Sequence, residues 1–169
     1  MEKNFATSLD TRSHITTLIL PIVLIGTLIL MIMADADSKT EISYPLPFIV
    51  HGLIFIVYGF CYALRPTSYV VTSEKLTIKR LLGHLTFSLN DIEKAEIVKK
   101  EDMRFVMRTF GNGGIFGYTG KFYHSNFGNM TWYATRLSNY VLITLKSGKK
   151  IMLTPNDTAL ATAITSQLK

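Results

Sequence analysis

The segment richest in side chains that could carry chemistry runs from residue 105 to residue 133 and combines glycine with aromatic residues. It holds nine of the chain's 19 aromatic residues and six of its 11 glycines. The run GNGGIFGYTG invites comparison with nucleotide loops, but the dinucleotide pattern starting at Gly111 needs a glycine where Phe116 stands. A phosphate loop ending in the Gly-Lys pair at 120–121 needs a glycine where Ile115 stands. The spacing therefore excludes both nucleotide-binding patterns.

Other residue sets that support catalysis are sparse. The chain has no Gly-x-Ser-x-Gly elbow and no His-Glu-x-x-His metal helix, and its four histidines are scattered. The single cysteine, Cys61, excludes an intrachain disulfide and a zinc site built on several thiolates, and its apolar surroundings favour a packing role. We predict no catalytic, cofactor-binding or metal-binding residue and a protein that is not an enzyme; a membrane enzyme with segment 105–133 as a lid is the third alternative.

Two interpretations of segment 105–133 stay open. In the structural one, the aromatic side chains bury one another and the glycines allow positive φ or close backbone approach, so the segment is an ordered excursion between two strands. In the functional one, the segment docks on a membrane or a protein partner, and its basic residues contact anionic lipid headgroups. The candidate recognition surface consists of Arg104, Arg108, Phe110, Phe116, Tyr118, Lys121, Phe122 and Trp132.

The elements that would position this segment begin with two apolar runs. Residues 15–34 carry no charge, and 12 of these 20 residues are Leu, Ile or Val. At a rise of ~1.5 Å per residue, a helix of this length crosses the ~30 Å hydrocarbon core of a bilayer. A second uncharged run ends at residue 64, and its prolines at 45 and 47 suit the start of a helix. We predict a transmembrane hairpin over 15–64, with helices at 15–34 and 45–64, inserted in a lipid bilayer.

The charges that flank the two runs predict an orientation. Basic residues precede the first run and follow the second, whereas the link at 35–44 has one lysine against three acidic residues. Because lysine and arginine accumulate on the cytoplasmic side, we expect a multi-pass protein of the inner (cytoplasmic) membrane with both termini cytoplasmic, a cytoplasmic tail over 1–14 and an external link. Residues 34–36 (Ala-Asp-Ala) have the form of a signal-peptide cleavage site, so cleavage of the first run stays open, although 20 apolar residues exceed the usual ~7–15.

From residue 65 onward, apolar and polar residues alternate as they do in strands with one solvent-exposed face. The strongest case is the pair 140–146 and 149–154, because the Ser-Gly dipeptide between them predicts a two-residue hairpin. Beyond Pro155 the chain offers helix-capping residues and then leucine and isoleucine four apart on one face, which predicts a short amphipathic helix. The other predicted strands lie at 69–72, 75–79, 85–89 and 92–98.

A series of strands followed by one C-terminal amphipathic helix is the layout of pleckstrin-homology (PH) domains, and several stretches resemble bacterial PH-like domains that follow transmembrane helices. The glycine-rich run RTFGNGGIFGYTGKF at 108–122, with WYAT at 132–135, is similar to a signature of one uncharacterised bacterial PH-like family. The resemblance implies an α+β fold: a two-helix transmembrane hairpin, then a PH-like β-barrel or sandwich over 65–169 with about six to seven strands capped by a C-terminal α-helix. The other stretches that carry it are YVVTSEKLTIKR at 69–80, LTFSLNDIEKAEI at 85–97 and LKSGKKIMLTPND at 145–157.

The net charge of +6 is unevenly divided between the two parts. Residues 1–64 hold three basic and five acidic residues, whereas residues 65–169 hold 15 basic and seven acidic ones. The basic residues of the second part form no long stripe, so we predict no nucleic-acid partner and expect the membrane surface to be the nearer polyanion. PH folds mostly bind lipid or protein, so the resemblance implies a non-catalytic binding or scaffolding module that makes protein–protein or homo-oligomeric contacts at the cytoplasmic membrane face. The alternative is a sensor of anionic lipid headgroups.

Overall fold

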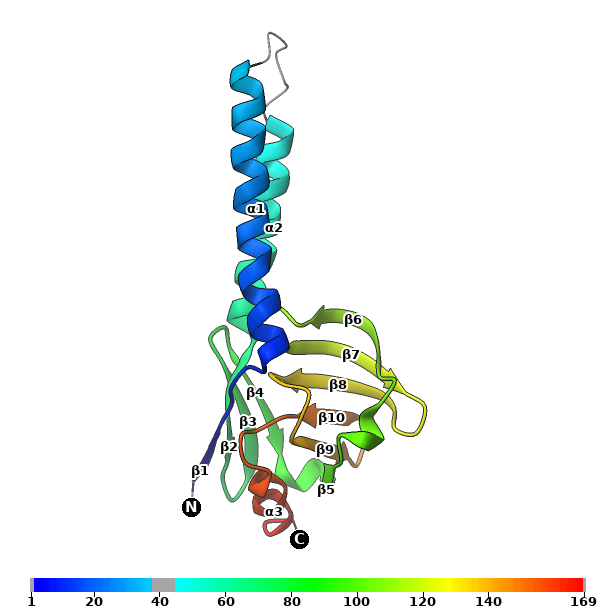
Figure 1. The fold of residues 1–169 in the computed structure, drawn as a ribbon. Helices are drawn as coiled ribbons and strands as arrows, with labels where there is room; N and C mark the ends of the chain where they lie inside the picture. Colours follow the sequence, from blue (N-terminus) through cyan, green and yellow to red (C-terminus); the bar gives the residue numbers. More distant parts are fainter. Residues whose placement is uncertain (1, 38–44, 169) are drawn as a thin grey trace.

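The computed structural model describes residues 2–37 and 45–168, which form two long helices standing on a two-sheet domain (Figure 1). α1 (Thr11–Asp37) and α2 (Pro45–Leu64) lie side by side and project from one end of the domain, which we call the helix end. Both helices are long and apolar enough to cross a membrane, and no side chain of residues 46–64 is buried. Continuous exposed apolar surface of this kind is typical of a contact with lipid or protein.

The helix bounds match the predicted second helix and extend the first. α2 covers the residues predicted for it, whereas α1 exceeds the range 15–34 at both ends. Its earlier start has a local cause, because the Asp10 carboxylate accepts a hydrogen bond from the Ser13 N–H (2.8 Å) and caps the helix. The predicted external link at 35–44 lies partly in α1, and its residues 38–44 lie outside the described residues.

The first sheet is antiparallel with strand order β1-β2-β3-β4. Its edge strand is formed by residues that the sequence predicts as part of a tail, 1–14, since β1 pairs with β2 in the register Lys3↔Val71 to Ala6↔Ser68. Four residues of mixed polarity have too little periodicity to reveal a strand whose partner is so distant in sequence. The strands are β1 (Lys3–Ala6), β2 (Pro66–Val71), β3 (Lys75–Arg80) and β4 (His84–Ser88).

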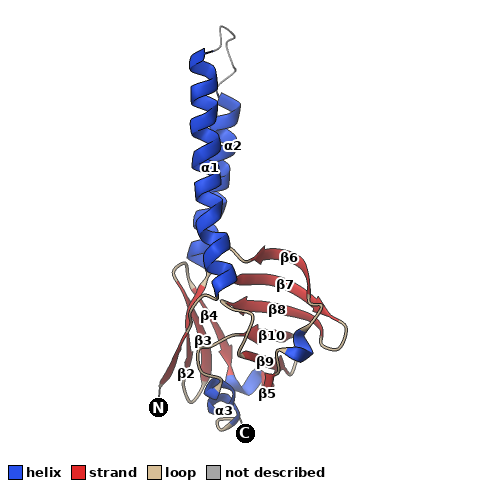
Figure 2. Ribbon diagram, in the orientation of Figure 1, coloured by secondary structure: helices blue, strands red, loops and turns tan. Residues whose placement is uncertain are grey.

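The second sheet has six strands in the order β5-β9-β10-β8-β7-β6, with β6 at the helix end and β5 at the opposite edge (Figures 1 and 2). Adjacent strands in this sheet are antiparallel, except that β8 and β10 pair in parallel. β9 and β10 form the predicted hairpin. Segment 105–133 supplies three of these strands, so residues 65–168 form nine strands where about six to seven were predicted, and β1 adds a tenth. The strands are β5 (Ile92–Val98), β6 (Met107–Gly113), β7 (Tyr118–His124), β8 (Gly128–Ala134), β9 (Tyr140–Leu145) and β10 (Lys150–Leu153).

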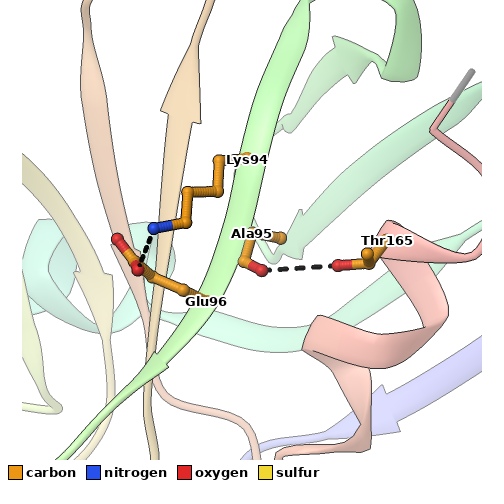
Figure 3. Close-up of polar contacts among 4 residues, drawn as sticks. All are labelled: Lys94, Ala95, Glu96 and Thr165. Carbon is orange, nitrogen blue, oxygen red and sulfur yellow. Dashed lines mark hydrogen bonds and ion pairs between the residues drawn. The ribbon is translucent and has the colours of Figure 1, made fainter.

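Two hydrophobic clusters fill the domain. One lies between the sheets and under α3 (Ala159–Thr165), the predicted C-terminal helix, which buries Leu160 and Ile164. The Thr165 hydroxyl donates to the Ala95 carbonyl (3.3 Å) and joins α3 to β5, as Figure 3 shows beside the Lys94–Glu96 ion pair. The other cluster lies on the second sheet around Trp132. Short 3₁₀ turns at Leu89–Asp91 and Glu101–Met103 flank β5. The order of helices and strands confirms the α+β class predicted from the sequence.

Asp10 connects α1 to the second sheet. Besides capping the helix, its carboxylate accepts hydrogen bonds from the Leu137 N–H (3.0 Å) and the Tyr118 hydroxyl (3.4 Å). Its own N–H donates to the Thr135 carbonyl (3.3 Å). Because one carboxylate serves both elements, the direction in which the helices leave the domain is coupled to the position of the sheet.

Replacing this carboxylate should destabilise the domain. Asp10→Ala removes the helix cap and leaves the Leu137 N–H without its acceptor, so we expect a loss of about 2–3 kcal/mol in the free energy of unfolding. The measurement is urea unfolding of the full-length protein followed by the fluorescence of Trp132, the only tryptophan.

The matched control is Asp157→Ala, because that carboxylate accepts a hydrogen bond only locally, from the Ala159 N–H at the start of α3 (2.8 Å). We expect it to cost about 1 kcal/mol. Equal losses for the two variants would contradict a connecting role for Asp10.

Candidate functional site

The two long helices and segment 105–133 meet at a junction created by Pro21. Pro21 lies inside α1 and has no N–H to donate to the Thr17 carbonyl one turn earlier. The Tyr58 hydroxyl of α2 donates to that carbonyl instead (3.0 Å), and the Thr17 hydroxyl accepts the Phe116 N–H from the loop between β6 and β7 (2.9 Å). One buried threonine therefore links α1, α2 and the loop.

Phe116 belongs to this junction and is not freely exposed. Its ring lies 4.8 Å from the Tyr58 ring and 5.1 Å from the Tyr62 ring, measured between centroids. The Arg65 guanidinium is 4.6 Å from the centroid of Tyr62 and 5.9 Å from that of Phe116. The Phe116 side chain therefore packs against α2.

Three more residues of the predicted surface are buried in the cluster around Trp132. Trp132 is 1% exposed and stacks on Phe122 with 4.5 Å between ring centroids. Tyr118 is also buried; burial raises the pKa of its phenol, and the neighbouring Asp10 carboxylate acts in the same direction. These three side chains belong to the buried cluster on the second sheet, and they also line a hollow of about 380 Å³ beside it. Aromatic density alone does not say which rings face inward: the three buried rings alternate with more exposed residues on β7 and β8, whereas on β6 a register shift between Arg108 and Phe110 interrupts the alternation.

The remaining four predicted residues, Arg104, Arg108, Phe110 and Lys121, are exposed. Arg108 and Phe110 lie together on β6, where Phe110 is 77% exposed. Lys121 lies on β7 and donates to the Thr131 hydroxyl (2.7 Å), and Arg104 precedes β6. The exposed residues of the predicted surface therefore lie on β6, on the neighbouring strand β7 and just before β6.

Two apolar residues that the sequence did not single out lie beside α2. Leu81 and Leu82 lie in the turn between β3 and β4 and are 67% and 52% exposed. The Leu82 N–H donates to the Ala63 carbonyl (2.9 Å), which attaches this turn to the last turn of α2. Turns usually carry polar residues, so adjacent leucines before Gly83 were a signal that could have revealed them. With β6 they form what we call the helix-end surface, which consists of Leu81, Leu82, Met107, Arg108 and Phe110.

A groove of about 590 Å³ separates β6 and β7 from the last turns of α2. Val57, Phe60 and Leu64 form its helix wall, and Phe110 and Ile115 contribute to the opposite wall. Its polar side chains include Arg80, whose Nε is buried without a hydrogen-bond partner, and Arg108. Burial raises the pKa of the nearby Tyr133 phenol, and the Arg80 charge opposes that shift. The described residues contain no group of three or more His, Cys, Asp or Glu placed to hold a metal ion.

These features define a class: a helix-capped, two-sheet PH-like domain attached to two apolar helices at the edge of its larger sheet. The family model for the bacterial PH domain matches residues 67–166, more than half of the chain, so the protein belongs to the bacterial PH domain family. The predicted family resemblance is thereby confirmed. β1 and the two long helices lie outside the matched residues. Neither the comparison with curated proteins nor the comparison with solved structures found a match.

The geometry of the groove depends on a close approach of β6 and β7 at Gly111. Gly111 has φ +109°, and a Cβ there would lie 2.3 Å from the Thr119 carbonyl oxygen. We expect Gly111→Ala to separate the two strands and to cost about 2–3 kcal/mol in the free energy of unfolding, measured through Trp132 fluorescence.

The matched control is Gly128→Ala, which also places alanine at positive φ (+69°) but meets no atom within 4 Å. It should cost only about 1–2 kcal/mol, the strain of the left-handed conformation. If Gly111→Ala were no more destabilising than this control, the close contact would not be required.

Proposed function

We propose that the protein is a non-catalytic membrane-bound binding module whose PH-like domain contacts the leaflet from which its helices emerge. α1 and α2 cross the bilayer, both termini are cytoplasmic, and the membrane is the cytoplasmic one. The supporting facts are the length and exposed apolar surface of the helices and the excess of basic residues on their domain side.

One observation carries the proposed leaflet contact. Three exposed apolar side chains of the domain, Leu81, Leu82 and Phe110, lie beside the last turns of α2: the Leu82 N–H donates to the Ala63 carbonyl, and Phe110 lines the groove opposite the helix. Leu81 and Phe110 are each more than 60% exposed there, and Met107 is 64% exposed on the same edge strand. Side chains of this kind gain free energy by entering the interfacial region of a bilayer, and Arg108 beside them adds about 1 kcal/mol near anionic lipid.

The geometry favours lipid over protein as the main contact. An exposed edge strand can also pair with a strand of another protein, but the outer edge of β6 lies on the side where the helices depart, so a bilayer there would occupy that space. The opposite edge, β5, carries Glu93, Lys94 and Glu96, and such charges discourage strand pairing. Homo-oligomeric or protein–protein assembly is therefore the second candidate, and Ile97, 55% exposed on β5, is the feature that favours it.

Photo-crosslinking tests the leaflet contact. A diazirine amino acid is placed at Phe110 in the full-length protein, which is reconstituted in phospholipid vesicles and irradiated. We expect phospholipid adducts by mass spectrometry, because Phe110 enters the headgroup region.

The matched control carries the same amino acid at Ile97, which is also apolar and exposed but lies on the far edge strand. Equal lipid labelling at both positions, or none at Phe110, would refute the leaflet contact. Protein dimers in place of lipid adducts would favour assembly.

A further inference from the structure

The hollow of about 380 Å³ beside Trp132 lies on the face of the second sheet that is turned away from the first sheet. Along β9, Ile143 belongs to the cluster between the sheets, whereas the neighbouring Leu142 belongs to the cluster around Trp132. Because successive side chains of a strand point to opposite faces, this hollow is distinct from the space between the sheets. Its volume lies within the range of small-molecule sites, roughly 300–1,000 Å³.

The floor of the hollow is aromatic. Phe122 and Trp132 stack on each other, and the Tyr140 ring is tilted against Trp132 with 5.7 Å between ring centroids. Burial raises the pKa of the Tyr140 phenol, and the Tyr118 phenol and the Asp10 carboxylate act in the same direction, so the polar ends of the two tyrosines lie near each other. A floor of this kind favours a ligand that carries a ring of its own, because aromatic rings attract one another in offset or edge-to-face arrangements.

Two guanidinium groups stand at the rim of this floor. The Arg108 guanidinium lies against Gly113, where an added Cβ would be 2.7 Å from its Nη1, and Gly113 is the register partner of Tyr118. Arg12, in the first turn of α1, lines the same hollow. Burial raises the pKa of the Tyr118 phenol, and the Arg12 charge opposes that rise. The two cations therefore approach Tyr118 from different elements.

These guanidinium groups are not neutralised by the protein. Neither arginine forms an ion pair in the described part of the chain, where the one pair joins Lys94 and Glu96. Asp10 is the acid at this end of the hollow, but its carboxylate is already engaged by the Ser13 N–H and the Leu137 N–H. The two guanidinium groups therefore keep their donors available to an external anion, and a carboxylate can accept two parallel hydrogen bonds from one arginine.

We propose that this hollow binds a small aromatic carboxylate, with its ring against the floor of Phe122 and Trp132 and its carboxylate held by Arg12 and Arg108. The rim selects an anion and the floor selects a ring, so one molecule that carries both satisfies the two parts of the site. This adds a soluble ligand to the membrane-bound module. Of the residues that form the helix-end surface, Arg108 alone lines the hollow, so the site and the leaflet contact are tested separately.

The test uses Trp132 as the reporter, because it is the only tryptophan and lines the hollow. The full-length protein in phosphatidylcholine nanodiscs is titrated with hydrocinnamate and with hydrocinnamyl alcohol, which has the same ring and chain but no charge. We expect a saturable change in Trp132 emission with hydrocinnamate, at an affinity roughly tenfold or more above that of the alcohol.

Arg12→Gln and Arg108→Gln should each weaken hydrocinnamate binding roughly fivefold or more, because each removes one charged contact at the rim. Both side chains are exposed, so the floor stays intact and binding of the alcohol should change less than about twofold. Arg104→Gln is the matched control, since Arg104 is an exposed arginine just before β6 that does not line the hollow. It should change hydrocinnamate binding less than about twofold.

No saturable response to hydrocinnamate, equal affinities for the acid and the alcohol, or equal effects of the three arginine variants would overturn the proposal. Displacement of hydrocinnamate by equimolar inorganic phosphate, or by phosphatidylglycerol in the nanodisc, would also overturn it, because the rim would then belong to a free anion or to a lipid. Lipid labelling at Phe110 that persists when hydrocinnamate does not bind would leave the leaflet contact standing and reject this site.

Discussion

The arrangement of the whole molecule depends on the attachment of the N-terminal segment to the domain. β1 extends the first sheet. Its last residue, Ala6, accepts a hydrogen bond from the Asn156 N–H (2.9 Å), and the Ser8 carbonyl accepts one from Arg136 (3.2 Å). Asp10 then joins the start of α1 to the second sheet. The helices thus leave a folded domain and not a flexible tail, so their direction is set by the same contacts that hold the sheets.

This attachment determines which edge of the large sheet lies beside the helices. Thr17 receives the Phe116 N–H and the Tyr58 hydroxyl, so the loop between β6 and β7 is held against both helices. β6 is consequently the strand at the helix end, and the groove forms where α2 passes it. In the function we propose, the bilayer is the surface that this edge meets. The leaflet contact would then follow from one geometric constraint.

The sequence predicted the parts of this architecture that depend on local pattern. Uninterrupted apolar runs predicted both long helices, Ser147-Gly148 predicted a hairpin, and leucine and isoleucine spacing predicted α3. It did not predict the parts set by distant partners. β1 has four residues and pairs with a strand beyond both long helices. Asp10 looks like an ordinary tail residue until the fold places hydrogen-bond donors around its carboxylate. Within segment 105–133 the residue types were visible, but the division into buried Phe122 and exposed Phe110 depends on the bulge in β6.

The central claim is that the large sheet stands with its β6 edge at the bilayer and its β5 edge in water. Nitroxide labels at Met107, Lys121 and Glu93, on β6, β7 and β5, test it directly in a Cys61→Ala background reconstituted in vesicles. The quantity measured is the collision rate of each label with a water-soluble nickel complex. The account predicts that this rate is lowest at Met107, intermediate at Lys121 and highest at Glu93. Equal nickel accessibility at the three positions would contradict it.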